Sequence, residues 1–409
     1  MTVLVSILGL AVLILIHEAG HFFTALAVGI RPRKFYIGFP PPLAKITRNG
    51  IEYGIGAIPL GGYVRIPGMH RPAAKDLDLN FSAAVREAPE LQPLVETVER
   101  HLDADDRTAA QAAVGPLRAA VEAAQLSRLA RKTAERGLRD LEEGLGGDAY
   151  WRQPIWKRIA VIFAGPATNI VFAIGLLALV YAIGAPTNDA SRKVGEVQGG
   201  RPAATAGLRA GDEIVAVDGR PTPTFEAIRR RISASHGRPI TVTVLRHGRT
   251  VTLGPARTVK AGDRWVFGFV PSPVLRSYPV GTAFGKALDD CWLATKGMGL
   301  AIAGLFDQHG RGQLTSTVGI VRVSSEALKV SFRIYLEILG FISLSLALLN
   351  LLPLLPLDGG HILFTIIEGI RRRAVAREVY ERASVIGFAV ILMIAFIALS
   401  NDLGGKRPG

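Results

Sequence analysis

Two histidines flank a glutamate inside an apolar stretch near the start of the chain, in the order His17-Glu18-Ala19-Gly20-His21. Residues four apart in a helix lie on one face, about one turn from each other, so both imidazoles can reach one metal ion. The glutamate would then lie beside a water molecule on that metal. Because ionisable groups at bilayer depth are costly and usually functional, the motif indicates a metalloprotease that works within a membrane.

A catalytic zinc ion also needs a third protein ligand and one open position. We expect Asp358 to be that ligand, because it follows an apolar segment that prolines and glycines interrupt. Irregular backbone at membrane depth is tolerated only where it is buried in protein or lines a cavity. His361 nearby and Glu337, several turns earlier, are the alternatives. Asn350 lies at the start of the interruption and could donate a hydrogen bond to a substrate carbonyl or an oxyanion.

The composition is that of a protein lying partly within and partly outside a membrane. Of 409 residues, 49% are hydrophobic and 20% are charged, with a net charge of +14. The basic residues are scattered except for a cluster at 371–373, and no compact basic and aromatic patch indicates nucleic acid. We therefore expect no nucleic-acid partner and expect contact with anionic lipids. The single cysteine, Cys291, excludes an intramolecular disulfide framework and a cysteine-ligated zinc.

Four apolar segments approach or exceed the roughly 20 residues that a bilayer span requires, at 1–30, 157–185, 333–370 and 383–401. The first lacks a basic start and a small-residue cleavage site, so we expect a retained membrane helix rather than a signal peptide. The loop at 371–382 is rich in arginine, and the positive-inside rule places it in the cytoplasm. The N-terminus would then lie outside, with the histidine motif toward the cytoplasmic side.

The segments between the spans differ in their residue patterns. The sequence predicts a polytopic α-helical membrane protein with four transmembrane helices and five further segments. These are a membrane-associated β-hairpin region at 31–76, a cytoplasmic α-helical insert at 77–148, an extracytoplasmic β-rich α+β domain at 190–275, an amphipathic helix and linker at 280–332, and a C-terminal tail at 402–409. The helical insert carries Pro116, which we expect near a turn between its helices.

Taken together, the motifs resemble the site-two intramembrane zinc metalloproteases, in the bacterial form that carries a periplasmic PDZ domain. Residues 200–212 are similar to the start of such a PDZ domain. The resemblance covers nearly the whole chain apart from the insert at 78–145. It rests on the histidine motif, Gly61-Gly62-Tyr63-Val64, Phe163-Ala164-Gly165-Pro166-Ala167-Thr168-Asn169, the run from Asn350 to Pro356, and Leu357-Asp358-Gly359-Gly360-His361.

The resemblance implies a metal site and a base at named positions. One zinc ion per chain would be held by His17, His21 and Asp358, and Glu18 would be the catalytic base. It also implies typical substrates: single-span membrane proteins, such as anti-sigma factors, and signal-peptide remnants. These would be cut in the bacterial inner membrane after a first cleavage by a site-one-type protease.

The resemblance assigns roles around the metal as well. Asn169 and Asn350 would position the substrate or stabilise the oxyanion. The β region would hold the substrate as an added strand, with Ile55 and Ile58 as the presenting positions. The PDZ domain would act as a size filter or bind peptide in a groove at Ala206-Gly207-Leu208.

Two departures and two rival functions accompany the resemblance. Gly38-Phe39-Pro40-Pro41 replaces the Gly-Phe-Gly-Pro turn usual in the family, and Ser316-Thr317-Val318 stands where a Gly-Pro pair often precedes Gly-Ile. Neither touches the metal ligands. The rivals are a non-enzymatic membrane PDZ adaptor and a zinc sensor or transporter. The intact ligand set with Glu18 argues against the adaptor. A sensor or transporter would have several polar residues along its spans, but the second span from residue 159 onward and the fourth span lack charged residues.

Overall fold

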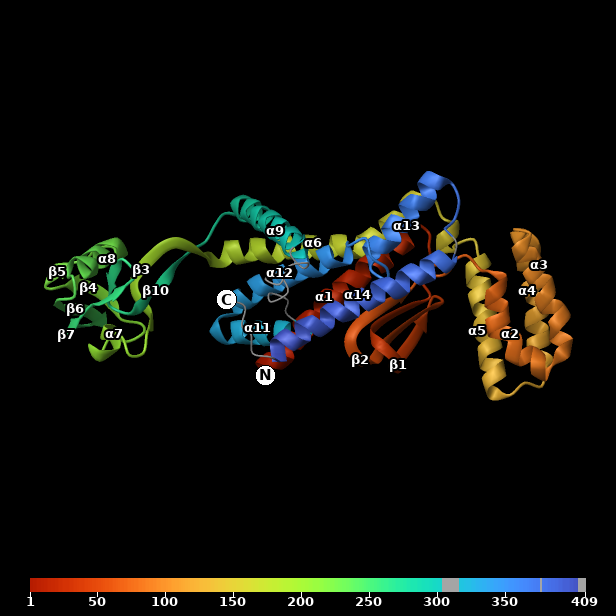
Figure 1. Ribbon diagram of the computed structural model, residues 1–409, viewed down its shortest axis with the longest axis horizontal. Coiled ribbons are helices and arrows are strands. Elements are labelled where there is room, and N and C mark those ends of the chain that lie inside the picture. The colour runs from red at the N-terminus through yellow and green to blue at the C-terminus, as the bar shows by residue number, and fades with distance from the viewer. Residues whose placement is uncertain (304–315, 376, 404–409) are drawn as a thin grey trace. The chain divides into compact units, whose positions relative to one another are not determined.

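The computed structural model describes residues 1–303, 316–375 and 377–403 (Figure 1). The chain separates into two compact units, one made of residues 1–177 and the chain from 287 onward, the other of residues 178–286. The first unit holds the histidine motif, the β region and the helical insert. The second is a small β-rich unit.

Within the described residues, four helices are long and apolar enough to cross a membrane. They are α1 (Thr2–Ala27), α6 (Ile155–Gly184), α12 (Phe332–Asn350) and α14 (Arg377–Leu403). In the most apolar 18-residue stretch of α14, only 11% is buried inside the protein, so most of its apolar side chains face outward. An apolar surface of this length fits lipid rather than water, and the chain is a membrane protein with an added β-rich region.

The predicted third span at 333–370 is two helices rather than one. Helix α12 ends at Asn350, and helix α13 (Asp358–Arg371) begins at the predicted metal ligand. The connection contains Pro353 and Pro356, which lack the backbone N–H that a continuous helix needs. Two further helices, α9 (Val280–Ala303) and α11 (Thr317–Val330), cover most of the predicted amphipathic segment and linker.

The β region consists of two long antiparallel strands, β1 (Lys34–Arg48) and β2 (Ile51–Arg65). Both strands bend, so residues 34–37 pair with 52–55 on one side and with 62–65 on the other. The sheet therefore has four limbs in the order 44–48, 51–56, 34–37 and 62–65. The limb at 62–65 lies at one edge, because its only strand partner among the described pairings is 34–37.

The insert is a bundle with its own apolar core. Leu77, Phe81, Leu117 and Leu138 are almost fully buried in it. The expectation that Pro116 marks a turn is wrong, since Pro116 lies inside the third helix of the bundle. The helices are α2 (Ala74–Glu87), α3 (Gln92–Asp103), α4 (Arg107–Ala123) and α5 (Arg128–Leu145).

The turns of the insert are set by capping residues instead. Asp106 accepts a hydrogen bond from the Ala109 N–H at the start of α4, and Ser127 accepts one from the Ala130 N–H at the start of α5. Each cap satisfies a backbone donor that has no partner within the helix. The caps therefore fix where α4 and α5 begin, whereas Pro116 only removes one hydrogen bond from within α4.

The second unit is an antiparallel sheet with two helices. Its strands follow the order β10-β3-β4-β6-β7, with β5 pairing with β4, and β8 and β9 form a separate hairpin. Val194, Ile214, Val242 and Phe267 are buried in its core. The elements are β3 (Ala185–Val197), α7 (Pro202–Thr205), β4 (Glu213–Val217), β5 (Arg220–Pro221), α8 (Phe225–Ala234), β6 (Pro239–Arg246), β7 (Arg249–Arg257), β8 (Val259–Ala261), β9 (Arg264–Val266) and β10 (Phe269–Arg276).

Candidate active site

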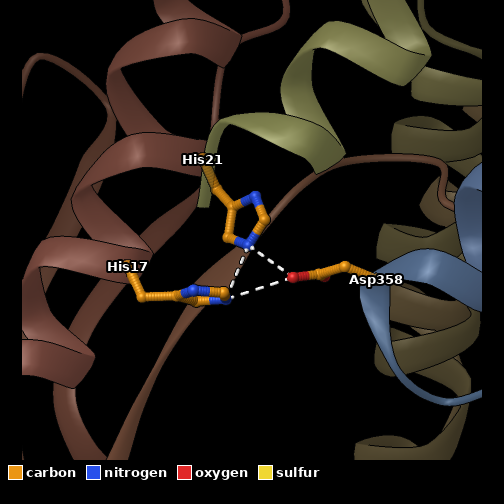
Figure 2. A group of neighbouring side chains, drawn as sticks. All are labelled: His17, His21 and Asp358. Atoms are coloured by element: carbon orange, nitrogen blue, oxygen red, sulfur yellow. Dashed lines mark hydrogen bonds and ion pairs between the residues drawn. The ribbon is translucent and has the colours of Figure 1, made fainter. Parts of the chain in front are cut away.

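Three side chains from two distant segments converge inside the first unit (Figure 2). His17 and His21 lie on α1 and are both 7% exposed, and Asp358 begins α13. The two Nε2 atoms are 3.2 Å apart. Asp358 Oδ2 lies 3.1 Å from His17 Nε2 and 3.5 Å from His21 Nε2. One potential ligand atom of each residue thus faces a common point.

These distances fit a tetrahedral zinc ion. Two ligands each about 2.0–2.1 Å from such an ion are about 3.3 Å apart, close to the three separations in the cluster. The His21 Nδ1–H donates to the Val161 carbonyl, 2.8 Å away, which leaves a lone pair on Nε2. Two imidazoles and one carboxylate are also the donor set typical of catalytic zinc. The residues therefore suit the metal in atom type, number and spacing.

Helix α6 packs against His17 and His21. The Val161 carbonyl orients the His21 ring, a role that an outer-shell partner commonly takes in metal sites. Gly165 lies so close that a Cβ there would collide with His21 Nε2 and come within 2.9 Å of His17 Cε1. Gly165 belongs to the Phe163–Asn169 motif of the resemblance, whereas Val161 has no signal in the sequence beyond an apolar side chain inside an apolar span.

The interrupted segment places Asp358. A Cβ on Gly359 would overlap the Leu351 and Leu352 carbonyl oxygens, so only glycine allows the connection to fold back against the start of α13. This fold-back brings the first residue of α13 up to α1. A carboxylate at a helix N-terminus is also favoured by the helix dipole, which helps to hold it ionised next to the histidines.

Glu18 and the three ligands share a cavity of ≈430 Å³. Gly62 and Val64, which belong to the edge limb of the β sheet, line this cavity. A Cβ on Gly62 would come within 3.1 Å of the Glu18 Cγ, so this limb lies beside the predicted base. The other lining residues come from α1, the β region, α6 and the segment around Asp358: Ile14, Phe39, Gly61, Gly62, Tyr63, Ile66, Met69, Ile162, Leu346, Asn350, Pro356, Leu357 and His361.

The two alternative third ligands lie outside the cluster. His361 lines the cavity, but its ring packs against Tyr380 with centroids 5.9 Å apart. Glu337 forms an ion pair with Arg333 on its own helix, at 3.1 Å. Among the described residues, the group able to hold a metal consists of the two histidines and Asp358.

The two predicted asparagines have different surroundings. Asn350 ends α12 and lines the cavity beside Asp358. Asn169 is fully buried in α6, does not line the cavity, and its side-chain amide has no hydrogen-bond partner among the described residues. Its backbone carbonyl accepts a hydrogen bond from Ser343 Oγ of α12, at 2.9 Å. Asn169 thus lies where α6 and α12 meet, beyond the cavity wall.

The predicted presenting positions lie away from the free edge. Ile55 pairs with both Ile37 and Ala44, and Ile58 pairs with Phe39. Their side chains are exposed, but the Ile55 backbone already has a strand on each side. A substrate strand can pair only with unpaired backbone groups, and 62–65 is the limb that offers them next to the cavity.

The predicted groove of the second unit is also displaced. Ala206-Gly207-Leu208 follows α7, and Leu208 is buried in the core of that unit. A hollow of ≈370 Å³ lies elsewhere in the unit, between α8 and the β9–β10 region. Phe225, Ile228 and Phe269 are among the apolar residues that line it.

This chain matches a known protein family and several named proteins over nearly its whole length. The model of peptidase family M50 matches residues 5–394. A Brucella suis protein is 28% identical over 98% of this chain and 95% of its own, and an Agrobacterium fabrum protein is 29% identical over 97% and 94%. Both bear the name "Putative zinc metalloprotease". Metalloprotease MmpA of Caulobacter vibrioides is 28% identical over 96% of this chain and 93% of its own.

The family match extends over the histidine motif, the segment around Asp358 and the spans that carry them. Its zinc requirement agrees with the donor set in the structure, and the four apolar helices agree with a protease of the membrane. This chain is a membrane zinc metalloprotease that belongs to peptidase family M50, the site-two proteases.

Proposed function

We propose that this protease hydrolyses peptide bonds in or near the transmembrane segments of single-span membrane proteins. The observation that carries the proposal is the shared cavity, which brings Glu18 together with His17, His21 and Asp358 at a site formed by apolar helices. Anti-sigma factors and signal-peptide remnants are substrates of the proposed class, after a first cut by a site-one-type protease. The proposed location is the bacterial inner membrane.

Each side chain at the site has a separate role in the proposed reaction. A bound zinc ion would polarise the scissile carbonyl and make water more acidic. Glu18 takes a proton from the attacking water and passes it to the leaving amine. Asn350, which lines the cavity, donates a hydrogen bond to the substrate carbonyl as negative charge develops on its oxygen. His17, His21 and Asp358 hold the metal.

The substrate must be extended at the site, because a helical peptide bond is shielded by its own backbone. We propose that the edge limb at 62–65 receives the substrate as an added strand. The proposal is supported by the closeness of this limb to Glu18, because a Cβ on Gly62 would come within 3.1 Å of the Glu18 Cγ. Ile55 and Ile58 would then contact the substrate through their exposed side chains, without pairing with its backbone.

We further propose that the second unit is an extracytoplasmic PDZ domain. Its strands and helix α8 agree with such a domain, and its groove would be the hollow lined by Phe225, Ile228 and Phe269 rather than Ala206-Gly207-Leu208. It would admit trimmed substrates, either by size or by binding their new ends. The arginine-rich segment at 371–382 would lie in the cytoplasm and contact anionic lipids.

The decisive experiment compares purified wild type with Glu18→Gln in detergent, using a model single-span substrate. We expect one zinc ion per chain in both proteins and cleavage by the wild type alone, because the substitution removes the proton acceptor and keeps the ligands. Glu326→Gln is the matched control, since Glu326 is exposed on α11 and its one ion pair among the described residues is with Arg322. It should cleave like the wild type.

Either of two other outcomes would contradict the proposal. Equal cleavage by the wild type and Glu18→Gln would assign the reaction to another group. Zinc in both proteins without cleavage of any single-span substrate, trimmed or full length, would favour the membrane adaptor.

A further inference from the structure

A second cavity, of ≈790 Å³, lies in the first unit beside the helical insert. Its walls come from the end of the β region, the insert, the first turn of α6, the end of α13 and the start of α14. The charged lining is mainly basic, with two carboxylates, Asp103 and Glu368. Its arginines are Arg71, Arg107, Arg158, Arg372 and Arg373.

One wall is rigid and cationic. The Trp151 ring lies near both Arg71 and Arg107, with guanidinium carbons 5.6 and 5.0 Å from the ring centroid. The indole N–H donates to the Gly144 carbonyl at 2.7 Å, which fixes the ring. Asp105 pairs with both arginines, at 2.5 and 3.1 Å. The two guanidinium groups are therefore held in place before any ligand arrives.

The cavity lining also contains a buried arginine. The Arg158 side chain is 9% exposed and its Nη2 lies 2.7 Å from Glu368 Oε2. Glu368 also accepts a hydrogen bond from the Val375 N–H, at 3.0 Å, so this carboxylate is already satisfied. Nε of Arg158 is buried and has no hydrogen-bond partner in the part of the chain that the structure describes.

Two further arginines, Arg372 and Arg373, directly follow α13 and line the cavity with exposed side chains. Within residues 1–303, 316–375 and 377–403, neither makes an ion pair or a side-chain hydrogen bond. These two unpaired guanidinium groups line the same cavity as Trp151. Guanidinium groups bind phosphate through paired, charge-assisted hydrogen bonds.

The position of the cavity points to a lipid as the source of the phosphate. Ile155 and Tyr380, which line it, lie in the first turns of α6 and α14, two of the apolar helices long enough to span a membrane. Within two residues of lining residues in the chain, Trp156, Ile370 and Val379 expose 62%, 79% and 50% of their surface. Acyl chains could cover these apolar side chains while the headgroup entered the cavity.

We propose that this cavity binds the phosphate headgroup of an anionic membrane lipid. Its volume lies in the range of about 300–1,000 Å³ common for small-ligand sites. A bound headgroup would join the insert to the ends of α6, α13 and α14. Met69 lines both this cavity and the catalytic one, so the lipid would border the active site. The inference adds a defined site to the lipid contact in the proposed function, and it does not depend on proteolysis.

The test measures lipid binding to the full-length chain by native mass spectrometry, in the Glu18→Gln background so that activity plays no part. The probes are dioctanoyl phosphatidylglycerol, dioctanoyl phosphatidylcholine and inorganic phosphate. We expect one phosphatidylglycerol per chain, bound at least tenfold more tightly than either other probe. Arg372→Gln combined with Arg373→Gln should weaken phosphatidylglycerol binding at least tenfold.

The matched control is Arg128→Gln combined with Arg139→Gln. This pair removes the same charge from exposed positions on α5, and neither residue lines the cavity. It should change the affinity less than twofold. Zinc content, measured in every variant, reports an intact core. An equal loss in both pairs, equal binding of phosphatidylcholine, or phosphate binding as tight as that of the lipid would each overturn the proposal.

Discussion

Asp358 and Asp212 are both carboxylates in buried surroundings, one in each unit, but their neighbours differ. Asp212 is 1% exposed and accepts hydrogen bonds from Arg246 Nε and Nη2, both at 2.7 Å, and from the Arg209 N–H at 2.8 Å. Asp358 instead faces two imidazole nitrogens, and that of His21 presents a lone pair because Nδ1 carries the proton.

The difference separates a structural carboxylate from a ligand. A buried carboxylate with all its donors in place needs nothing further and fixes the local fold. Lone pairs that converge within 4.8 Å of one another repel unless a cation lies between them. The close approach of ligand atoms at Asp358 is therefore unfavourable unless a metal ion binds between them. The pairing at Asp212, in contrast, stabilises its unit without a ligand.

The largest effect should follow from Asp358→Asn. The amide keeps the size of the side chain but removes its charge, so we expect zinc affinity to fall roughly 100-fold or more, with cleavage falling in parallel. Zinc content after dialysis at fixed free zinc measures the first effect. Asp212→Asn, the mirror variant, should keep its zinc. Full zinc in Asp358→Asn would remove Asp358 from the ligand set.

A smaller loss should follow from Gly165→Ala. The added Cβ would collide with His21 Nε2, so the histidines must shift, and we expect zinc affinity to fall roughly 10- to 100-fold. Gly175→Ala is the control on the same helix, because a Cβ there meets nothing within 4 Å. Equal zinc affinities in the two variants would show that α6 does not constrain the histidines.

Asp212→Asn should act on stability alone. Removing the charge leaves Arg246 without its ionic partner, and we expect the second unit to lose about 2–3 kcal/mol. Hydrogen exchange of peptides from 185–276 measures the loss. Asp263→Asn, an exposed position in the same unit, should change the exchange by less than about 0.5 kcal/mol. A comparable loss in both variants would contradict a special role for the Asp212 pairing.

The smallest effect should be a pH dependence of the stability of the β region. Hydrogen bonds from Lys34 and then Tyr36 lower the pKa of Glu52 from 4.5 to about 2, against the opposing effect of burial. Because the native pKa lies below the unfolded one, the stabilisation is complete above pH 4.5 and is lost as pH falls toward 2.

Hydrogen exchange of residues 34–65 between pH 5 and pH 2.5 tests this dependence after correction for the intrinsic exchange rate. Glu52→Gln should remove the part of the pH dependence that comes from this carboxylate. Glu135→Gln, an exposed position on α5, should leave it unchanged. A pH dependence that persists in Glu52→Gln would place the titrating group elsewhere.

Local patterns made several elements of this fold predictable. The four-residue spacing of His17 and His21 puts both rings on one helix face whatever surrounds them. The β-rich α+β pattern at 190–275 coincides with strands such as β4 and β6 and with helix α8. Neighbouring residues encode these features, so the sequence alone contains them.

Other features arise between segments far apart in the chain. The fold-back at Gly359, the approach of Gly165 to the histidines and the approach of Gly62 to Glu18 each join separate elements. No local period predicts them. The same limit explains why Asn169 was predicted near the substrate although it lies beyond the cavity wall, and why Pro116 was expected at a turn.

The sequence by itself determined that this chain is a membrane metalloprotease, because the chemistry depends on a few residue types inside apolar segments. Only the tertiary structure decided which limb of the β sheet lies beside Glu18 and which arginines surround the second cavity. The physical reason is that ligand type and helical period are local properties. Packing and strand pairing are set by contacts over the whole fold.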